Sequence, residues 1–237
     1  MAEEQRGHAR SLGFGNPMGA ELLLDQRAVK RAWIFMFAAL ALYAWPFSFL
    51  ARGALGWVGV VHFIGFGAPH PAPMRGWILA TMVVVLFCAA GMRGYPLIKQ
   101  HVFDWGTIKF VAIMFALLSG LMEEVWFRYG LMNWAQSHGH DPATQVVYSA
   151  VIFGGAHAIW GVAARNWRVA MGSMVATGLL GAALALVYIV SDRVVAPCIW
   201  AHIAINLVLE PWLLIAAMMR GFGSNRVAPA GARVAKP

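Results

Sequence analysis

The sequence predicts an all-α membrane protein, a polytopic bundle of about six transmembrane helices with one short re-entrant or interfacial segment. Of its 237 residues, 60% are hydrophobic and 12% are charged, whereas soluble domains carry about 25% charged residues. The apolar residues fall in blocks long enough to cross a bilayer, which takes about 20 helical residues. No internal repeat divides the chain, so we expect a single domain.

Six apolar blocks are the candidate spans. In chain order they are 32–50, 77–92, 107–134, 146–163, 169–190 and 194–219. The first block is longer than the apolar core of a signal peptide and lacks a small-residue cleavage site, so we expect a retained helix. Residues 54–68 are apolar but short and rich in glycine, which favours a re-entrant or interfacial segment over a span.

The transmembrane domain is expected to occupy residues 29–220. Residues 1–28 are predicted to form a partly disordered cytoplasmic segment. Residues 221–237 are rich in Gly, Ala, Pro and Arg, which predicts a disordered tail. Cys88 and Cys198 lie singly in apolar blocks, which is typical of packing residues and provides neither a disulfide framework nor metal-binding spacing.

The net charge of +8 would suggest nucleic-acid binding in a soluble protein, but here the basic residues flank the apolar blocks, so no nucleic acid is expected. With six spans and the N-terminus inside, the inner segments carry Arg6, Arg10, Arg27, Lys30, Arg31, Arg93, Lys99, Arg165, Arg168, Arg220, Arg226, Arg233 and Lys236, and the outer loops carry Arg52, Arg75 and Arg193. This asymmetry predicts that both termini are cytoplasmic. The short chain and compact loops favour a bacterial inner membrane.

Ionisable side chains inside the spans mark the candidate site, because a charge at membrane depth is costly and usually faces a cavity or a partner. Glu123 and Glu124 are adjacent, so on a helix they point about 100° apart. Glu124 can pair with Arg128 on one helix face. Glu123 then remains free to act as a general base on water. The alternatives are a purely structural Glu–Arg pair or ion-translocating carboxylates.

Two later motifs add imidazoles. Phe153-Gly-Gly-Ala-His157 contains small residues that let a neighbouring helix approach closely, although a lone histidine is also compatible with packing. His202 and Asn206 share a helix face, where they can donate to an oxyanion, hold a metal or a water, or form an interhelical hydrogen-bond pair. Together with Glu123 they lie about 12–18 Å below the outer border, near the midplane, which favours one shared cavity.

In this order, Glu-Glu-x-x-x-Arg from Glu123, Phe-x-x-x-His from Phe153 and His-x-x-x-Asn from His202 resemble the motifs of the CAAX protease and bacteriocin-processing (CPBP) family of intramembrane proteases. The best-known members are CAAX prenyl endopeptidases. The resemblance covers about a third of the chain. This chain has fewer spans than the eukaryotic CAAX enzymes, which leaves the type of substrate open.

The resemblance implies a role for each matching residue. Glu123 would activate water together with His157. His202 and Asn206 would stabilise the oxyanion or complete a metal site. Glu124 would complete the catalytic set and, together with Arg128, shape the helix and orient the site. The supporting residues would be Arg128 and Phe153, of which Phe153 packs.

Two mechanisms remain open. Glu123, His157, His202 and Asn206 suffice in number as zinc ligands, although Asn is an unusual one. Without a metal, Glu123 takes a proton from water, the hydroxide attacks the peptide carbonyl, and His202 and Asn206 donate hydrogen bonds to the oxyanion. The substrate would be a membrane-associated protein or peptide, lipidated or not. Alternative functions are a non-catalytic bacteriocin-immunity or scaffold protein on the same fold and a proton-coupled transporter, for which a repeat is expected.

Two polar features lie outside the three motifs. The run His138-Gly-His140-Asp141 resembles a metal cluster by composition, but it falls in a predicted short outer loop. Glu210 follows Asn206 by one turn and can line the cavity. The adjacent Pro211 predicts a kink or a helix break, whose freed carbonyls can be satisfied locally.

Overall fold

The structure, a computed structural model, describes residues 26–54, 56–66, 69–103 and 107–218. All secondary structure in these residues is helical, as predicted. In chain order the elements are α1 (Gln26–Phe49), the π-helix η1 (Leu50–Ala54), α2 (Gly56–Phe63), α3 (Met74–Gly94), α4 (Pro96–His101), α5 (Thr107–Glu124), the π-helix η2 (Val125–Met132), α6 (Asn133–Ser137), α7 (Pro142–Ala156), α8 (Ile159–Ala164), α9 (Trp167–Val190) and α10 (Ala196–Met218). The predicted C-terminal tail and most of the predicted N-terminal segment lie outside the described residues.

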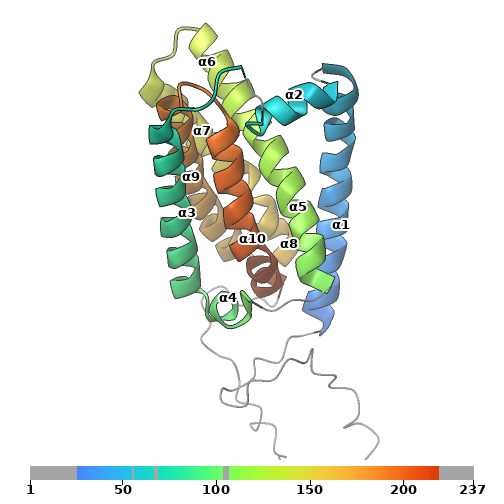
Figure 1. The fold of residues 1–237 in the computed structure, drawn as a ribbon. Helices are drawn as coiled ribbons and strands as arrows, with labels where there is room; N and C mark the ends of the chain where they lie inside the picture. Colours follow the sequence, from blue (N-terminus) through green and yellow to red (C-terminus); the bar gives the residue numbers. More distant parts are fainter. Residues whose placement is uncertain (1–25, 55, 67–68, 104–106, 219–237) are drawn as a thin grey trace, which may run out of the picture.

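The long helices run side by side as a bundle, which α2 and α4 cross at opposite ends (Figure 1). Within the described residues, the segments long and apolar enough to cross a membrane are Met74–Gly94, Pro142–Ala164, Trp167–Val190 and Ala196–Leu213. A fifth candidate is the pair Met36–Gly53 and Gly56–Phe63, which is bent by 115°. The chain is therefore a multi-pass integral membrane protein.

The remaining predicted span corresponds to α5 and its continuation through η2 into α6. Hydropathy alone does not identify α5 as a span, because it carries Lys109, Glu123 and Glu124. Glu123 and Glu124 are also the residues that made this block a candidate site. The described ends of α1 and α10 lie at the same end of the bundle (Figure 1), as expected for an even number of crossings.

The predicted re-entrant or interfacial segment forms α2, which has eight residues and is too short to cross a bilayer. The sharp bend between α1 and α2 lays this helix across the end of the bundle (Figure 1). Gly56 supports the turn into α2, because its φ of 69° lies in the left-handed region that other residues avoid.

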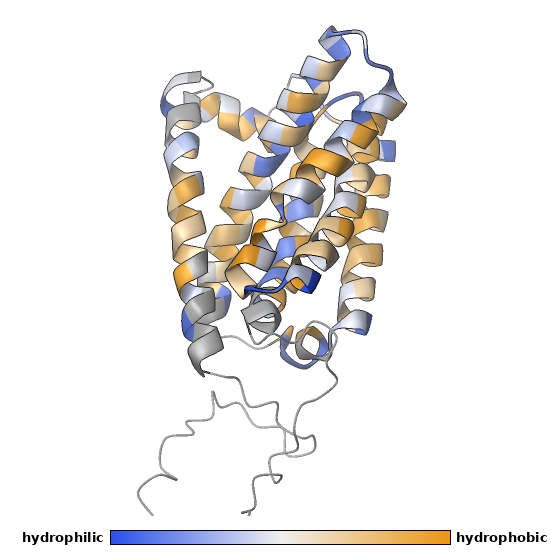
Figure 2. Cartoon of the chain, turned by 180° about the vertical axis from the view of Figure 1, so that it is seen from behind, coloured by the Kyte–Doolittle hydropathy of each residue, from blue (hydrophilic) through white to orange (hydrophobic). Residues whose placement is uncertain are grey.

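Hydropathy along the chain follows the bundle. Apolar residues dominate the long helices, and hydrophilic residues gather in the connection between α6 and α7 (Figure 2). Many large apolar side chains point outward, including Trp45, Val85 and Leu179, each at least 60% exposed. An exposed apolar surface of this kind suits contact with lipid.

The helices approach closely where glycine replaces a larger side chain. A Cβ added to Gly154 of α7 would lie 2.6 Å from the carbonyl oxygen of Met174 in α9. A Cβ added to Gly120 of α5 would lie 2.7 Å from the side chain of Ile203 in α10. The predicted close approach at the small residues before His157 is therefore confirmed.

The fourth predicted span is confirmed, but it is broken at the candidate histidine. α7 ends at Ala156 and α8 begins at Ile159. The His157 amide donates to the carbonyl oxygen of Gly154 at 3.1 Å, a tight turn that closes α7. The break places the His157 ring at a helix end instead of on a continuous helical face.

Candidate active site

Glu123 and Glu124 are the last two residues of α5, at the point where the helix widens into the π-helix η2. Both side chains are buried. π-helical turns within α-helices frequently occur at functional sites. The two carboxylates contact different partners, as predicted for adjacent helical residues.

Glu124 forms the predicted ion pair with Arg128. The Nε atom of Arg128 lies 3.1 Å from Oε2 of Glu124, and neither side chain is exposed. The other oxygen, Oε1, accepts a hydrogen bond from Nδ1 of His202 at 2.6 Å. Glu124 therefore connects η2 to α10, and its charge is balanced inside the apolar bundle.

The Glu123 carboxylate contacts a different set of side chains from those that surround Glu124. Its Oε1 accepts a hydrogen bond from the Tyr43 hydroxyl of α1. Its Oε2 lies 3.6 Å from Nε2 of His157 and 3.7 Å from Nε2 of His202. Among the described residues, no group donates a hydrogen bond to this buried oxygen. One carboxylate oxygen thus meets imidazoles from two other segments.

The hydrogen-bond partners define which nitrogen of each ring carries the proton. Nδ1 of His202 faces the Glu124 carboxylate, and Nδ1 of His157 faces the carbonyl oxygen of Phe153 at 2.8 Å. Both partners only accept, so each Nδ1 is a donor. In the neutral rings, the unprotonated Nε2 atoms therefore face Oε2 of Glu123.

Phe153 lies among the charged groups. Its buried ring has its centroid 4.5 Å from that of His157 and 5.7 Å from that of His202. The guanidinium carbon of Arg128 lies 4.7 Å from the same ring, a distance typical of a cation–π contact. Phe153 separates Arg128 from the imidazoles and fixes their relative positions.

Asn206 lies on α10, one turn after His202. Its Nδ2 donates to Oγ of Ser119 in α5 at 3.2 Å. Within the described part of the chain, no hydrogen bond joins Asn206 to Glu123 or to either histidine. The structure therefore places Asn206 beside the cluster and holds it against α5.

Sequence reasoning missed Tyr43 and Ser119. Each is a polar residue in an otherwise apolar helix, and a buried hydroxyl normally finds a partner. A polar residue in an apolar helix is a weak signal, because the sequence does not identify the hydrogen-bond partner of its hydroxyl. Tyr43 precedes Glu123 by 80 residues, so only the packing of α1 against α5 brings them together.

Lys109 satisfies the carbonyl freed by the predicted kink. Pro211 lacks the amide that would bond to the carbonyl oxygen of Leu207, four residues earlier. Nζ of Lys109 donates to this oxygen at 2.7 Å. The freed carbonyl is therefore satisfied, but by Lys109 of α5 and not locally, and α10 continues through Pro211 without a break. Glu210, the neighbouring carboxylate, has a buried Oε2 that receives no hydrogen bond from the described residues.

The run from His138 to Asp141 is occupied by local contacts. Asp141 caps α7, accepting hydrogen bonds from the amides of Ala143 and Thr144 and from the Thr144 hydroxyl. The Thr144 hydroxyl and amide hold the pKa of the Asp141 carboxyl below its usual value. Nδ1 of His138 lies 2.8 Å from the carbonyl oxygen of Trp134. These contacts explain the residues without a metal.

The predicted zinc ligands are Glu123, His157, His202 and Asn206. Among the described residues, no three His, Cys, Asp or Glu side chains are arranged as a metal site. Glu124, the neighbouring carboxylate, is engaged by Arg128 and His202. Zinc binding by the four predicted ligands stays a prediction.

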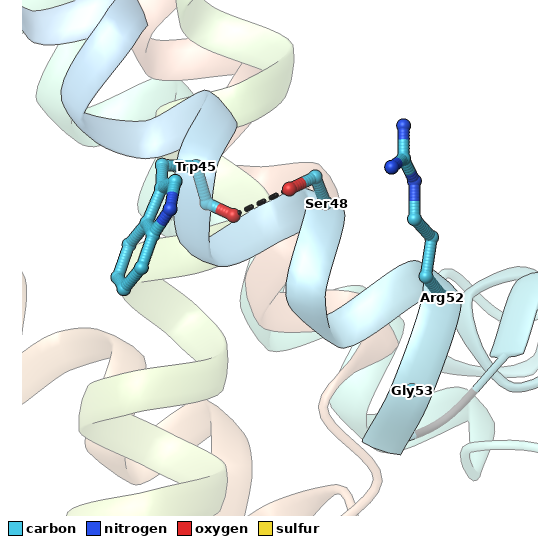
Figure 3. A pocket seen from close by; sticks show the side chains of 4 residues that line it. All are labelled: Trp45, Ser48, Arg52 and Gly53. Atoms are coloured by element: carbon cyan, nitrogen blue, oxygen red, sulfur yellow. Dashed lines mark hydrogen bonds between the residues drawn. The ribbon is translucent and has the colours of Figure 1, made fainter.

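A hollow near the end of α1 lies away from the glutamates. It is lined by Trp45, Ser48, Arg52 and Gly53, and the Ser48 hydroxyl donates to the Trp45 carbonyl oxygen at 2.7 Å (Figure 3). Trp45 follows Tyr43 by two residues, about 200° around the helix. The hollow therefore opens on the side of α1 opposite Glu123.

Residues 105–208 match a family described as Rce1-like, type II CAAX prenyl endopeptidase. The chain matches no curated protein and no solved structure. The matched range includes all three motifs and excludes Tyr43. The similarity to the Rce1-like type II CAAX prenyl endopeptidase family therefore extends over residues 105–208, the part of the chain that carries the three motifs.

Proposed function

We propose that this chain is an intramembrane endopeptidase in which Glu123 activates a water molecule. The observation that carries the proposal is the position of Glu123 Oε2, which lies within 3.7 Å of Nε2 of both His157 and His202. Three acceptor atoms that face one another attract a hydrogen-bond donor. A water molecule meets this requirement, since it donates two hydrogen bonds and offers its oxygen for attack.

Glu123 acts as the general base. As the water oxygen attacks the carbonyl carbon of the peptide, one of its protons passes to Oε2 of Glu123, and the carbonyl π electrons move to oxygen. The resulting tetrahedral intermediate collapses when Glu123 returns this proton to the leaving nitrogen. The C–N bond then breaks, and the products are a carboxylic acid and an amine.

His202 and Asn206 serve the oxyanion. His202 donates from Nε2 when the ring is doubly protonated, and the Glu124 carboxylate at Nδ1 stabilises that positive charge. Asn206 uses one N–H for Ser119 and retains a second for the oxyanion. His157 accepts a hydrogen bond from the attacking water and aligns it with Glu123. All of these roles are performed by the protein's own side chains.

The substrate we propose is a protein held at the membrane near its C-terminus. The family takes its name from prenylated proteins that end in Cys-aliphatic-aliphatic-X, and a lipid anchor would bring such a segment to the bundle. We further propose that both termini are cytoplasmic and that substrate approaches from that side. The basic residues of the inner segments support this orientation.

The test uses the full chain in lipid nanodiscs. The probes are an internally quenched, farnesylated peptide ending in Cys-aliphatic-aliphatic-X and the same peptide without the farnesyl group. In parallel, mass spectrometry compares membrane peptides from cells that carry the wild-type protein or Glu123→Gln. We expect new cleavage products that depend on Glu123.

Two outcomes would reject the proposal. Equal product profiles for wild type and Glu123→Gln, with no cleavage of either probe, would favour the non-catalytic immunity or scaffold alternative. Full proteolysis by the purified Glu123→Gln protein would remove Glu123 from the role of base. Matching unfolding temperatures for the two proteins would exclude misfolding as the reason for lost activity.

A further inference from the structure

The Tyr43 hydroxyl of α1 donates a hydrogen bond to one oxygen of the Glu123 carboxylate. We propose that Tyr43 is a positioning residue, which fixes Oε1 so that Oε2 faces the two imidazoles. The proposal rests on the proposed function of Glu123 as the base. It extends the site beyond residues 105–208, the range that the family match covers.

The Tyr43 ring is held by the same segment that carries Glu123. Its centroid lies 6.0 Å from that of Phe115 and 5.7 Å from that of Trp126. Phe115 belongs to α5 and Trp126 to η2, so the two aromatic neighbours flank Glu123 in the sequence. The direction of the phenol is thereby set relative to the carboxylate that it contacts.

The carboxylate has two distinct oxygens in this arrangement. Among the described residues, Tyr43 is the one donor to Glu123, and Oε2 accepts from none. The terminal torsion of a glutamate is broad and roughly two-fold, so a carboxylate without this donor can turn away from the histidines. A phenol that donates to one oxygen restricts this torsion.

The packing of α1 against the bundle is therefore part of the catalytic geometry. α1 packs against α5 and α10, the two helices that carry Glu123 and His202. Of the side chains on α1, Tyr43 reaches the catalytic carboxylate. A base aligned by α1 is competent only while this helix lies against the others.

The test compares Tyr43→Phe with Tyr148→Phe in the full chain. Tyr148 lies on α7, and its ring packs against His140, away from Glu123. Both changes remove one hydroxyl and keep the ring. Infrared spectra of protein labelled with ¹³C-glutamate identify the Glu123 carboxylate band as the band lost in Glu123→Gln. We expect Tyr43→Phe to shift this band and Tyr148→Phe to leave it in place.

Activity on the farnesylated peptide provides a second readout. We expect kcat to fall about 10- to 100-fold in Tyr43→Phe, as is typical when a residue that orients a site is lost, with little change in KM. A merely structural role would lower the unfolding temperature and leave the Glu123 carboxylate band in place.

The two proposals fail in different ways. An unchanged Glu123 band in Tyr43→Phe overturns the positioning role, whatever the activity. A shifted band together with full proteolysis by Glu123→Gln retains the contact but rejects Glu123 as base, and with it the catalytic meaning of Tyr43. A shifted band with reduced kcat supports both.

Discussion

Nδ1 of His202 lies 2.6 Å from Oε1 of Glu124, and the same carboxylate is paired through Oε2 with Arg128. This relationship orients the imidazole that faces Glu123. Glu124 has no role in activating the proposed water, but it determines the orientation of the His202 ring. A buried carboxylate with two partners is sensitive to the loss of either.

Removal of Glu124 should destabilise the fold strongly. In Glu124→Ala, the fully buried Arg128 keeps its charge without a partner, which typically costs about 3–5 kcal/mol. We expect a correspondingly lower free energy of unfolding, measured by denaturant titration in detergent. Arg128→Met should behave similarly, because it strands the carboxylate instead.

The control for this pair is the double variant Glu124→Ala/Arg128→Met, which removes both charges. It should recover much of the stability lost in the single variants, because the two residues lie in direct contact and their effects are not additive. Additive losses would show that the ion pair is not the source of the effect.

A second relationship joins α5 to Pro211 in α10. In Lys109→Met, the Leu207 carbonyl oxygen loses its 2.7 Å donor, and Pro211 prevents the helix from replacing it. A buried acceptor left unsatisfied costs about 1–3 kcal/mol. We expect this loss in the free energy of unfolding.

Pro211→Ala provides a specific rescue, because it restores the amide that can bond to the Leu207 carbonyl oxygen. The double variant Lys109→Met/Pro211→Ala should therefore be more stable than Lys109→Met alone. If Pro211→Ala gives the same change in both backgrounds, Lys109 and Pro211 are not coupled and this account of Pro211 fails.

The spans and most site residues could be predicted because their signals are local. An apolar block of sufficient length predicts a span, and an ionisable group within it predicts a site. Glu123, His157 and His202 were found in this way, although they belong to three different segments. Tyr43 could not be, because a single tyrosine in an apolar helix is compatible with ordinary packing and its partner is distant in sequence.

The helix break at His157 was also missed. The apolar pattern of residues 146–163 continues through it, so periodicity gives no sign of an end. Gly154 and Gly155 mark the place, but glycine before a histidine suggested close packing alone. The engagement of Asn206 by Ser119 depends in turn on the distance between α5 and α10, which no local pattern specifies.

The close approach of α5 and α10 predicts the effect of a larger residue at Gly120. A Cβ in Gly120→Ala would lie 2.7 Å from the Ile203 side chain and 3.1 Å from its backbone nitrogen. We expect a loss of about 1–3 kcal/mol of stability from overpacking and a lower kcat, because the helices that carry Glu124 and His202 move apart.

Gly172→Ala is the matched control, since a Cβ there meets no atom within 4 Å. It should leave activity unchanged, and within a helix it should stabilise slightly. Addition of Ile203→Ala to Gly120→Ala should restore part of the activity by removing most of the clash. Equal behaviour of Gly120→Ala and Gly172→Ala would mean that this contact does not set the helix spacing.

The metal-free route predicts that chelation leaves proteolysis intact. Among the described side chains, Glu123, His157 and His202 approach one another without the arrangement of a metal site, and the proposed reaction uses protons alone. We expect kcat/KM on the farnesylated peptide to be the same before and after prolonged dialysis against a strong chelator. Mass spectrometry of the purified protein should find zinc well below one atom per chain. Stoichiometric zinc that is lost together with activity, and activity that returns when zinc is added, would contradict the metal-free route. The water would then be activated by a metal ion and not by Glu123 alone.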